Sequence, residues 1–337
     1  MRALVLGHRD VLAALPLEAC AQAMTKVLTE HARGGTYMPL RSVMMPPGAA
    51  GFLGLMPAWR GPQPGQPEQP EQPAAFALKA VAVMPGNPAR GLDAHQGLVT
   101  LFDGETGVPV AILDASAITA VRTAAVTAVA TGLLARHDAR TMAVLGAGTQ
   151  ARAHLRALAH VRDFEQVRVY APTTAHARAL AEQVGVGRAE LSVAPTAEDA
   201  VREADVVVTA TSAREPVLRH AWLKPGAHVN AVGASTPQAR EIDTATVAAS
   251  ALFCDSRESL SHEAGEFALA VGEGLITGIG HVRGELGEVL AGLAPGRRDD
   301  GELTLFRSLG LAVEDLAAAE LAVTVAKERG IGTEVEL

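Results

Sequence analysis

Short apolar runs alternate with helical segments from residue 141 onward, and this alternation limits the possible folds more than any other feature of the sequence. Each run has the length of a buried strand, and each helical segment can connect two parallel strands. Such a series predicts an α/β fold with a Rossmann-type, doubly wound parallel sheet and helices on both faces. Six strands are predicted, at residues 141–145, 167–170, 191–193, 206–210, 227–232 and 252–254.

The first ~115 residues follow a different pattern. One helix is indicated by the spacing of its apolar residues, and the strand patterns around it include a β-hairpin signature. A segment rich in proline and glutamine interrupts them, and we interpret it as an extended surface loop. This half predicts an α+β domain with a mostly antiparallel sheet. Its elements are a helix at 16–31, strands at 42–45, 51–56 and 74–83, a hairpin at 98–113 and the loop at 61–73.

A chain of 337 residues is long enough for two domains. An alanine-rich helix at 116–136, with Ser116 as its N-cap, leads from one pattern into the other. The C-terminal helix is expected to pack back on the first domain. We therefore predict a first domain at 1–118, rejoined by residues 310–337, and a Rossmann domain at 119–309.

Composition disfavours several functions. A net charge of -8 and 3% aromatic residues argue against a nucleic-acid partner. The two cysteines, Cys20 and Cys254, cannot build a disulfide framework or a cysteine-rich zinc site. Glu258, Glu263 and Glu266 have no metal-ligand pattern, so we expect a solvated helix face and no metal. Without a signal-peptide pattern or a long apolar run, a cytoplasmic protein with no membrane partner is expected.

The most informative motif is a G-x-G-x-x-A sequence that directly follows the first predicted strand of the second domain. Gly146 permits a tight turn, Gly148 lets the backbone approach a pyrophosphate, and Ala151 lets the next helix lie close to the sheet. The N–H groups at the start of that helix, with Thr149 and Gln150, can then bind the phosphates. The motif therefore predicts a dinucleotide site; the alternative is an ordinary strand–helix turn.

The choice of cofactor is expected about 20 residues further on, where an acid commonly binds the ribose of NAD. The strand at 167–170 is followed by Ala171, Pro172, Thr173 and Thr174, with no acid before Glu182. Without a carboxylate there, a 2′-phosphate meets no repulsion, so NADP(H) is favoured and NAD(H) stays possible. Candidate contacts to that phosphate are Thr173, Thr174, His176, Arg178 and Arg152.

Five blocks, in order along nearly the whole chain, resemble the ornithine cyclodeaminase/mu-crystallin family. The block that begins Arg122-Thr-Ala-Ala is specific to the family; the others lie at 51–58, 144–151, 229–235 and 305–315. The resemblance implies a homodimer built through the first domain and an active site between the two domains. Family members include ornithine cyclodeaminases, alanine dehydrogenases and reductases of ketimines and pyrroline carboxylates.

The resemblance also assigns substrate-binding roles to Arg41, Lys79 and Arg122. Arginine can bind a carboxylate through two donors, as an imino acid requires. Lys79 interrupts an apolar strand, and nearby arginines, like burial, would lower its pKa. An ammonium made more acidic can donate a proton to an imine nitrogen. We therefore expect Lys79 to be the catalytic proton donor.

Further contacts are expected around these groups. Arg122 and Thr123 are implied in cofactor binding by the family block. Thr211, Ser212 and Val232 follow strands at the carboxyl edge of the parallel sheet, where ligands bind in such folds. His95 is a candidate for cofactor or substrate contact, with local hydrogen bonding as the alternative. Ser235 could bind the substrate or order a water, or it could be a small residue tolerated there. The cofactor-facing set adds Gly146, Gly148, Thr149, Gln150 and Thr173.

Two departures distinguish among activities of the family. The cyclodeaminase branch has a glutamate at the position of Gly54 and an aspartate at the position of Ser235. The family's alanine dehydrogenases also carry that aspartate. The sequence therefore favours reduction of small, cyclic α-imino acids, such as Δ1-piperideine-2-carboxylate or Δ1-pyrroline-2-carboxylate. The alternatives are ornithine cyclodeamination, amino-acid dehydrogenation, and a cofactor-dependent binding protein without turnover.

Overall fold

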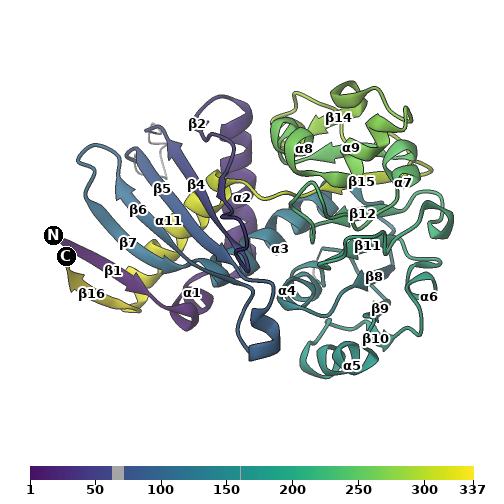
Figure 1. Ribbon diagram of the computed structural model, residues 1–337, viewed down its shortest axis with the longest axis horizontal. Coiled ribbons are helices and arrows are strands. Elements are labelled where there is room, and N and C mark those ends of the chain that lie inside the picture. Colours follow the sequence, from purple (N-terminus) through teal and green to yellow (C-terminus); the bar gives the residue numbers. More distant parts are fainter. Residues whose placement is uncertain (63–71, 160) are drawn as a thin grey trace. The chain divides into compact units, whose positions relative to one another are not determined.

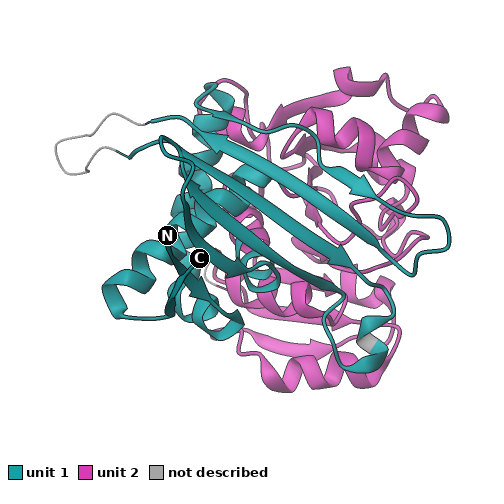
Figure 2. Ribbon diagram, turned by 60° about the vertical axis from the view of Figure 1, so that its left-hand side comes forward, with its two compact units in different colours: residues 1–122, 311–337 teal, residues 123–310 magenta. Residues whose placement is uncertain are grey.

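The computed structural model describes residues 1–62, 72–159 and 161–337, so most of the predicted loop at 61–73 lies outside the described residues. The chain forms two compact units (Figure 2). Unit 1 contains residues 1–122 and 311–337, and unit 2 contains residues 123–310. The C-terminal segment thus belongs to the same unit as the N-terminal strands.

Unit 1 is built on a sheet with strand order β16-β1-β7-β6-β5-β4-β2, and β3 also pairs with β4. All pairs are antiparallel except β1 with β7. The mixed, mostly antiparallel sheet confirms the predicted fold class, although β1, β2 and β16 were not predicted. The strands are β1 (Arg2–Leu6), β2 (Thr36–Tyr37), β3 (Ser42–Met44), β4 (Phe52–Arg60), β5 (Ala75–Val83), β6 (His95–Asp103), β7 (Pro109–Asp114) and β16 (Thr333–Glu336).

Helices pack on one face of this sheet (Figure 1). Helix α11 (Ala312–Arg329) contacts β4, β5 and β6 and also packs on α2 (Leu17–Ala32). Strand register places Met56, Lys79 and Val99 side by side on the face that α11 covers. The remaining helices of the unit are α1 (His8–Ala14) and the 3-10 turn η1 (Asn87–Arg90).

Helix α3 (Ala115–Leu134) begins in unit 1 and continues into unit 2. Its N-cap differs from the prediction: Asp114, rather than Ser116, accepts the hydrogen bond from Ala117 N, at 2.7 Å. A carboxylate at this position is also favourable next to the positive end of the helix dipole. The helix is apolar enough and long enough to cross a membrane, but 78% of its most apolar stretch is buried in the protein, as in a core helix.

Unit 2 contains an eight-stranded, all-parallel sheet with order β10-β9-β8-β11-β12-β15-β13-β14. The six predicted strands are all present. The structure adds two that the prediction missed, β14 and β15, each of which is four residues long and contains an arginine. The strands are β8 (Thr141–Leu145), β9 (Gln166–Tyr170), β10 (Glu190–Val193), β11 (Val206–Thr209), β12 (His228–Ala231), β13 (Ala251–Cys254), β14 (Val282–Glu285) and β15 (Thr304–Arg307).

Separate apolar cores cover the two faces of this sheet. Side chains alternate along each strand, so Val144 packs toward α4 and α5, whereas Leu145 packs toward α6 to α9. The strand order reverses between β8 and β11, and this switch point is where doubly wound sheets bind dinucleotides. The helices and 3-10 turns are α4 (Thr149–Leu158), α5 (Thr174–Gln183), α6 (Ala197–Val201), η2 (His220–Trp222), α7 (Thr244–Ala249), α8 (Arg257–Glu263), α9 (Gly265–Gly272), η3 (Gly278–His281) and α10 (Leu286–Leu290).

Candidate functional site

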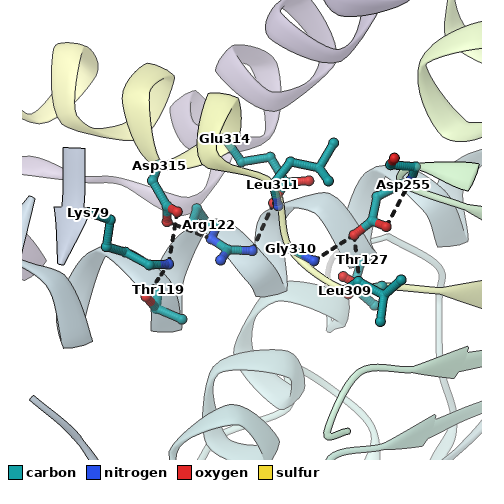
Figure 3. Close-up of polar contacts among 12 residues, drawn as sticks. Lys79, Thr119, Arg122, Thr127, Asp255, Leu309, Gly310, Leu311, Glu314 and Asp315 are labelled. Atoms are coloured by element: carbon teal, nitrogen blue, oxygen red, sulfur yellow. Dashed lines mark hydrogen bonds and ion pairs between the residues drawn. The ribbon is translucent and has the colours of Figure 1, made fainter. Parts of the chain in front are cut away.

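Lys79 lies in the middle of β5, and its side chain points into the interior of unit 1, toward α11 (Figure 3). The residue is only 3% exposed. Its Nζ is 2.8 Å from Asp315 Oδ2 and donates a hydrogen bond to Thr119 Oγ1 at 3.3 Å. Three elements, β5, α3 and α11, therefore fix the position of this ammonium group.

Arg122 lies on α3 beside Lys79 and is paired with the first turn of α11 (Figure 3). Its Nε donates to Asp315 Oδ1 at 3.0 Å, and its Nη1 donates to Glu314 Oε2 at 2.8 Å. Glu314 in turn accepts from the backbone N–H of Leu311 at 3.2 Å, which fixes the helix start. Asp315 bridges Lys79 and Arg122, one carboxylate oxygen to each.

The charges of this cluster are perturbed by burial and by one another. Burial, helped by Arg122 and Arg41 and opposed by Asp315, lowers the pKa of Lys79 to about 8. Burial alone would raise the pKa of Asp315, but Arg122 and Lys79 hold it below its ordinary value. Asp315 is therefore ionised near neutral pH, and Lys79 loses its proton at a pH only slightly above neutral.

The lowered pKa of Lys79 was expected from the sequence, but the arginines were expected to be its main cause, whereas burial is the largest. The opposing effect of Asp315 was not expected. The only available signal was a pair of acids, Glu314 and Asp315, inside an apolar stretch at the start of an alanine-rich helix. Buried acids need partners, so that pair pointed to cations elsewhere in the chain. Arg122 also differs from the expectation of an arginine devoted to ligands, since two of its donors bind carboxylates of its own chain.

Arg41 and His95 are close enough to this cluster to interact with it electrostatically. Arg41 is partly buried just before β3, close enough to Lys79 to lower its pKa. His95 is the first residue of β6, paired with Val83, and not part of a loop before the strand as predicted. His95 has solvent-exposed surface, but the protein around its ring removes part of its hydration and lowers its pKa. Lys79 and Arg122 act in the same direction.

The glycine motif of unit 2 has the geometry of a phosphate cradle. Gly146 has φ +127°, and a Cβ there would lie 2.3 Å from Ala210 O. A Cβ at Gly148 would meet no atom within 4 Å, so the space beside the start of α4 is open. Thr149 and Gln150 form the first turn of α4, and in the part of the chain described, no side chain caps it. These residues fit a dinucleotide pyrophosphate.

The end of β9 carries no acid, and Thr173 is exposed as the N-cap residue of α5. Arg152, one of the candidates for a 2′-phosphate, donates through Nη1 to Gln183 Oε1 at 2.7 Å. Arg152 is thus bonded within its own unit and is not held ready as a phosphate clamp.

At the carboxyl ends of β11 and β12, one predicted contact residue, Thr211, is held by a side chain that the sequence did not reveal. Glu241, buried just before α7, accepts hydrogen bonds from Thr211 N at 2.6 Å and from Gly233 N at 2.6 Å. Ser212 is exposed, whereas Val232 and Ser235 are partly buried. Thr123, by contrast, is buried in α3.

One expectation about charge is wrong. Glu263 and Glu266 do not belong to a solvated face: both are buried, and Glu266 forms an ion pair with Arg307. Burial of Arg307 inside the parallel sheet explains why an acid is needed there. Among the described residues, no group of three or more His, Cys, Asp or Glu side chains could hold a metal ion.

Comparison with known proteins agrees with this geometry. The model of the ornithine cyclodeaminase/mu-crystallin family matches residues 1–329. Ketimine reductase mu-crystallin of Mus musculus is 37% identical over 306 residues, covering 91% of this chain and 89% of its own length. The structure of Thermococcus litoralis Δ1-pyrroline-2-carboxylate reductase with NADH and L-proline has a TM-score of 0.91 at 35% identity, covering 98% of this chain and 100% of its own. An archaeal alanine dehydrogenase dimer with bound NAD has a TM-score of 0.90 at 33% identity, covering 100% of both chains. The chain belongs to the ornithine cyclodeaminase/mu-crystallin family.

Proposed function

We propose that this chain reduces small, cyclic α-imino acids to L-amino acids. It is an NAD(P)-dependent oxidoreductase acting on a C=N bond, in keeping with its relatives named as ketimine and Δ1-pyrroline-2-carboxylate reductases. Δ1-Pyrroline-2-carboxylate and Δ1-piperideine-2-carboxylate are the proposed substrates. L-Proline, bound in the similar structure, is the product that reduction of the first would give. The observation that carries the proposal is Lys79, a buried ammonium with a pKa of about 8.

Lys79 is the proposed proton donor to the imine nitrogen. The ammonium is ion-paired with Asp315 and donates to Thr119, and we propose that another of its three N–H bonds is directed to the imine nitrogen. Proton transfer forms a new N–H bond on the substrate and converts the imine to an iminium, a better hydride acceptor. Asp315 stays ionised throughout and holds the donor in place, so its proposed role is positioning.

Arg41 and Arg122 are proposed to attract the substrate carboxylate. Arg41 and Arg122 both lower the pKa of Lys79, so their positive charges act on the same site, where they can attract the carboxylate of an imino acid. His95, with its pKa lowered, favours the neutral ring and can hydrogen-bond the substrate without adding charge.

The glycine motif, Thr211, Ser212 and Val232 are proposed to hold the cofactor, with Arg122 and Thr123 contributing as the family resemblance implies. When bound, reduced nicotinamide supplies the hydride to the imine carbon. Relatives hold NADH or NAD. The absence of an acid after β9 supports the proposal that this chain also accepts NADPH and prefers it. Ser235 is proposed to hydrogen-bond the substrate.

A homodimer is proposed through the face of the unit 1 sheet opposite Lys79. Register places Trp59, Phe76 and Phe102 in one row across β4, β5 and β6 on that face. Phe76 and Leu98 are exposed there, at 45% and 52%. An apolar sheet face left uncovered favours association, and one relative of known structure is a dimer. We also propose that the enzyme works in the cytoplasm.

The competing oxidative activities are less favoured by the residues at two positions. Gly54 lies on β4 opposite Val81, on the same face as Lys79, and it offers no carboxylate to a second amino group. Ser235 offers none either. A binding protein without turnover would have no use for a buried, acidified Lys79.

The test is a comparison of both reaction directions with purified protein. NADPH and NADH oxidation are followed with the two cyclic imines, and NAD(P)+ reduction is followed with L-ornithine and L-alanine. We expect rapid turnover of an imine and none of ornithine, with a higher kcat/KM for NADPH. Turnover of ornithine to proline, or no turnover of any imine, would contradict the proposal; a higher kcat/KM for NADH would remove only the cofactor preference.

A further inference from the structure

Two loops at the carboxyl edge of the unit 2 sheet are held by buried charged side chains that no part of the proposed chemistry uses. One loop begins at Ala210 after β11, and the other begins at Val232 after β12. Both strands lie on the side of the switch point away from β9, where the half of a dinucleotide distal to the adenosine is expected.

Glu241 joins the two loops through both oxygens of its carboxylate. Oε1 accepts from Thr211 N at 2.6 Å and from Thr211 Oγ1 at 2.8 Å. Oε2 accepts from Gly233 N at 2.6 Å and from Thr209 Oγ1 at 2.9 Å. The residue is 1% exposed, and each of its four bonds holds an atom of β11 or of one of the two loops.

The two loops approach each other so closely that the residue at their contact must be glycine. A Cβ at Gly233 would lie 2.2 Å from Thr211 O and 2.5 Å from Glu241 Oε1. Val232 N also donates to Thr209 O at 3.0 Å. Only glycine fits at position 233, and a small movement of either loop would break bonds in both.

Arg307 holds the second loop from the other side. Its Nη1 donates to Ala231 O at 3.0 Å, and its Nη2 donates to Ala234 O. Its Nε is bound by the buried carboxylate of Glu266 on α9. Three backbone atoms within residues 231–234 are thus fixed by two buried charged side chains, at Ala231, Gly233 and Ala234.

We propose that Glu241 and Arg307 are positioning residues that preorganise these loops to seat the nicotinamide half of the cofactor. This inference rests on the proposed binding of NAD(P)H and adds the residues that determine the shape of its nicotinamide end. A loop fixed at several backbone atoms loses little conformational freedom when the ring binds, so affinity is gained without direct contact. The adenosine half is expected on the β9 side of the switch point, whereas the four bonds of Glu241 go to β11 and the two loops.

The test compares two ligands on the full chain by isothermal titration calorimetry. NADH contains the nicotinamide, and ADP-ribose lacks it; NADPH and 2′-phospho-ADP-ribose replace them if the phosphorylated cofactor binds more tightly. In Glu241→Gln, the side-chain nitrogen cannot accept the bonds of one loop. We expect the Kd for NADH to rise about tenfold or more, and that for ADP-ribose to stay within about twofold.

Asp205→Asn is the matched control. Asp205 precedes β11 at the other end of the strand and accepts from Arg140 N at 2.8 Å and from Thr141 N at 2.9 Å. It has a similar structural role without touching either loop, so stability should fall while both Kd values remain unchanged. If Glu241→Gln does not fold, Arg307→Lys is measured instead, with the same selective loss expected.

A parallel loss of both ligands in Glu241→Gln, or no loss of either, would overturn the inference. So would a selective loss of NADH in the Asp205→Asn control. A wild-type chain that binds NADH but reduces no imine would refute the proposed function and leave this test intact. A wild-type chain that binds no nicotinamide cofactor would overturn both.

Discussion

Replacing Asp315 with asparagine is expected to move the pH dependence of imine reduction to lower pH. Lys79 must be protonated to act as the donor, so activity falls as pH rises through its pKa of about 8. Asp315, 2.8 Å away, is the main group that raises this pKa, while Arg122 and Arg41 lower it. Removing the carboxylate therefore leaves only effects that make Lys79 more acidic.

The size of the shift follows from this geometry. Loss of a partner charge at such a distance changes a pKa by about 1–3 units. At pH 7.5, roughly three-quarters of Lys79 is protonated in the wild-type chain; a two-unit decrease would leave about 3%, a loss of ~25-fold. Much of the activity should return near pH 5.5, where the protonated fraction is restored to about its former value.

The assay is the pH profile of kcat/KM for a cyclic imine, and Glu314→Gln is the control. Glu314 bonds Arg122 from the same helix turn but is not among the main influences on the pKa of Lys79. Each variant removes one carboxylate from a buried ion pair, so each should lose about 3 kcal/mol or more of stability. Only Asp315→Asn should move the inflection. An unchanged inflection in that variant, or an equal shift in both, would refute the assigned role of Asp315.

Two other predictions concern the donor and the glycine motif. Lys79→Ala should lower the rate of imine reduction by at least ~100-fold, the scale of one lost general acid, with cofactor affinity intact by calorimetry; an unchanged rate would exclude Lys79 as the donor. Gly148→Ala should keep the wild-type melting temperature and lose NADH affinity, since its Cβ meets no protein atom, whereas Gly146→Ala should lower the melting temperature, since its Cβ would lie 2.3 Å from Ala210 O. Full NADH affinity in Gly148→Ala would show that the pyrophosphate does not approach there.

The fold class was predictable because the hydrophobic pattern follows the period of each element. Six strands of the parallel sheet were found, including β9 with its Arg168, whereas β14 and β15 were missed. Arg283 and Arg307 interrupt the apolar pattern of these two strands. Each is tolerated because a distant acid pairs with it, Glu302 and Glu266 respectively. Such ion pairs cannot be predicted from the residues next to each arginine in the sequence.

The candidate site was predictable to a similar extent. Lys79 could be recognised because burying an unpaired ammonium in an apolar strand costs free energy. The glycine motif could be recognised because it directly follows a strand. Asp315 and Glu241 could not be recognised in this way, because acidic residues on helices and turns are usually exposed to solvent. What makes them significant is a partner far along the chain: Asp315 and Arg122 are 193 residues apart in sequence.

That separation has a consequence for synthesis of the protein. Unit 2 is continuous in sequence, so it can fold as it leaves the ribosome, whereas unit 1 waits for α11 and β16, which are made after it. Until then, Lys79 and Arg122 have no counter-ion from α11, and the face of β5 that it covers is open. The nascent chain would present that apolar face with two cations that still lack the carboxylates of α11. Activity would begin only after α11 has been made.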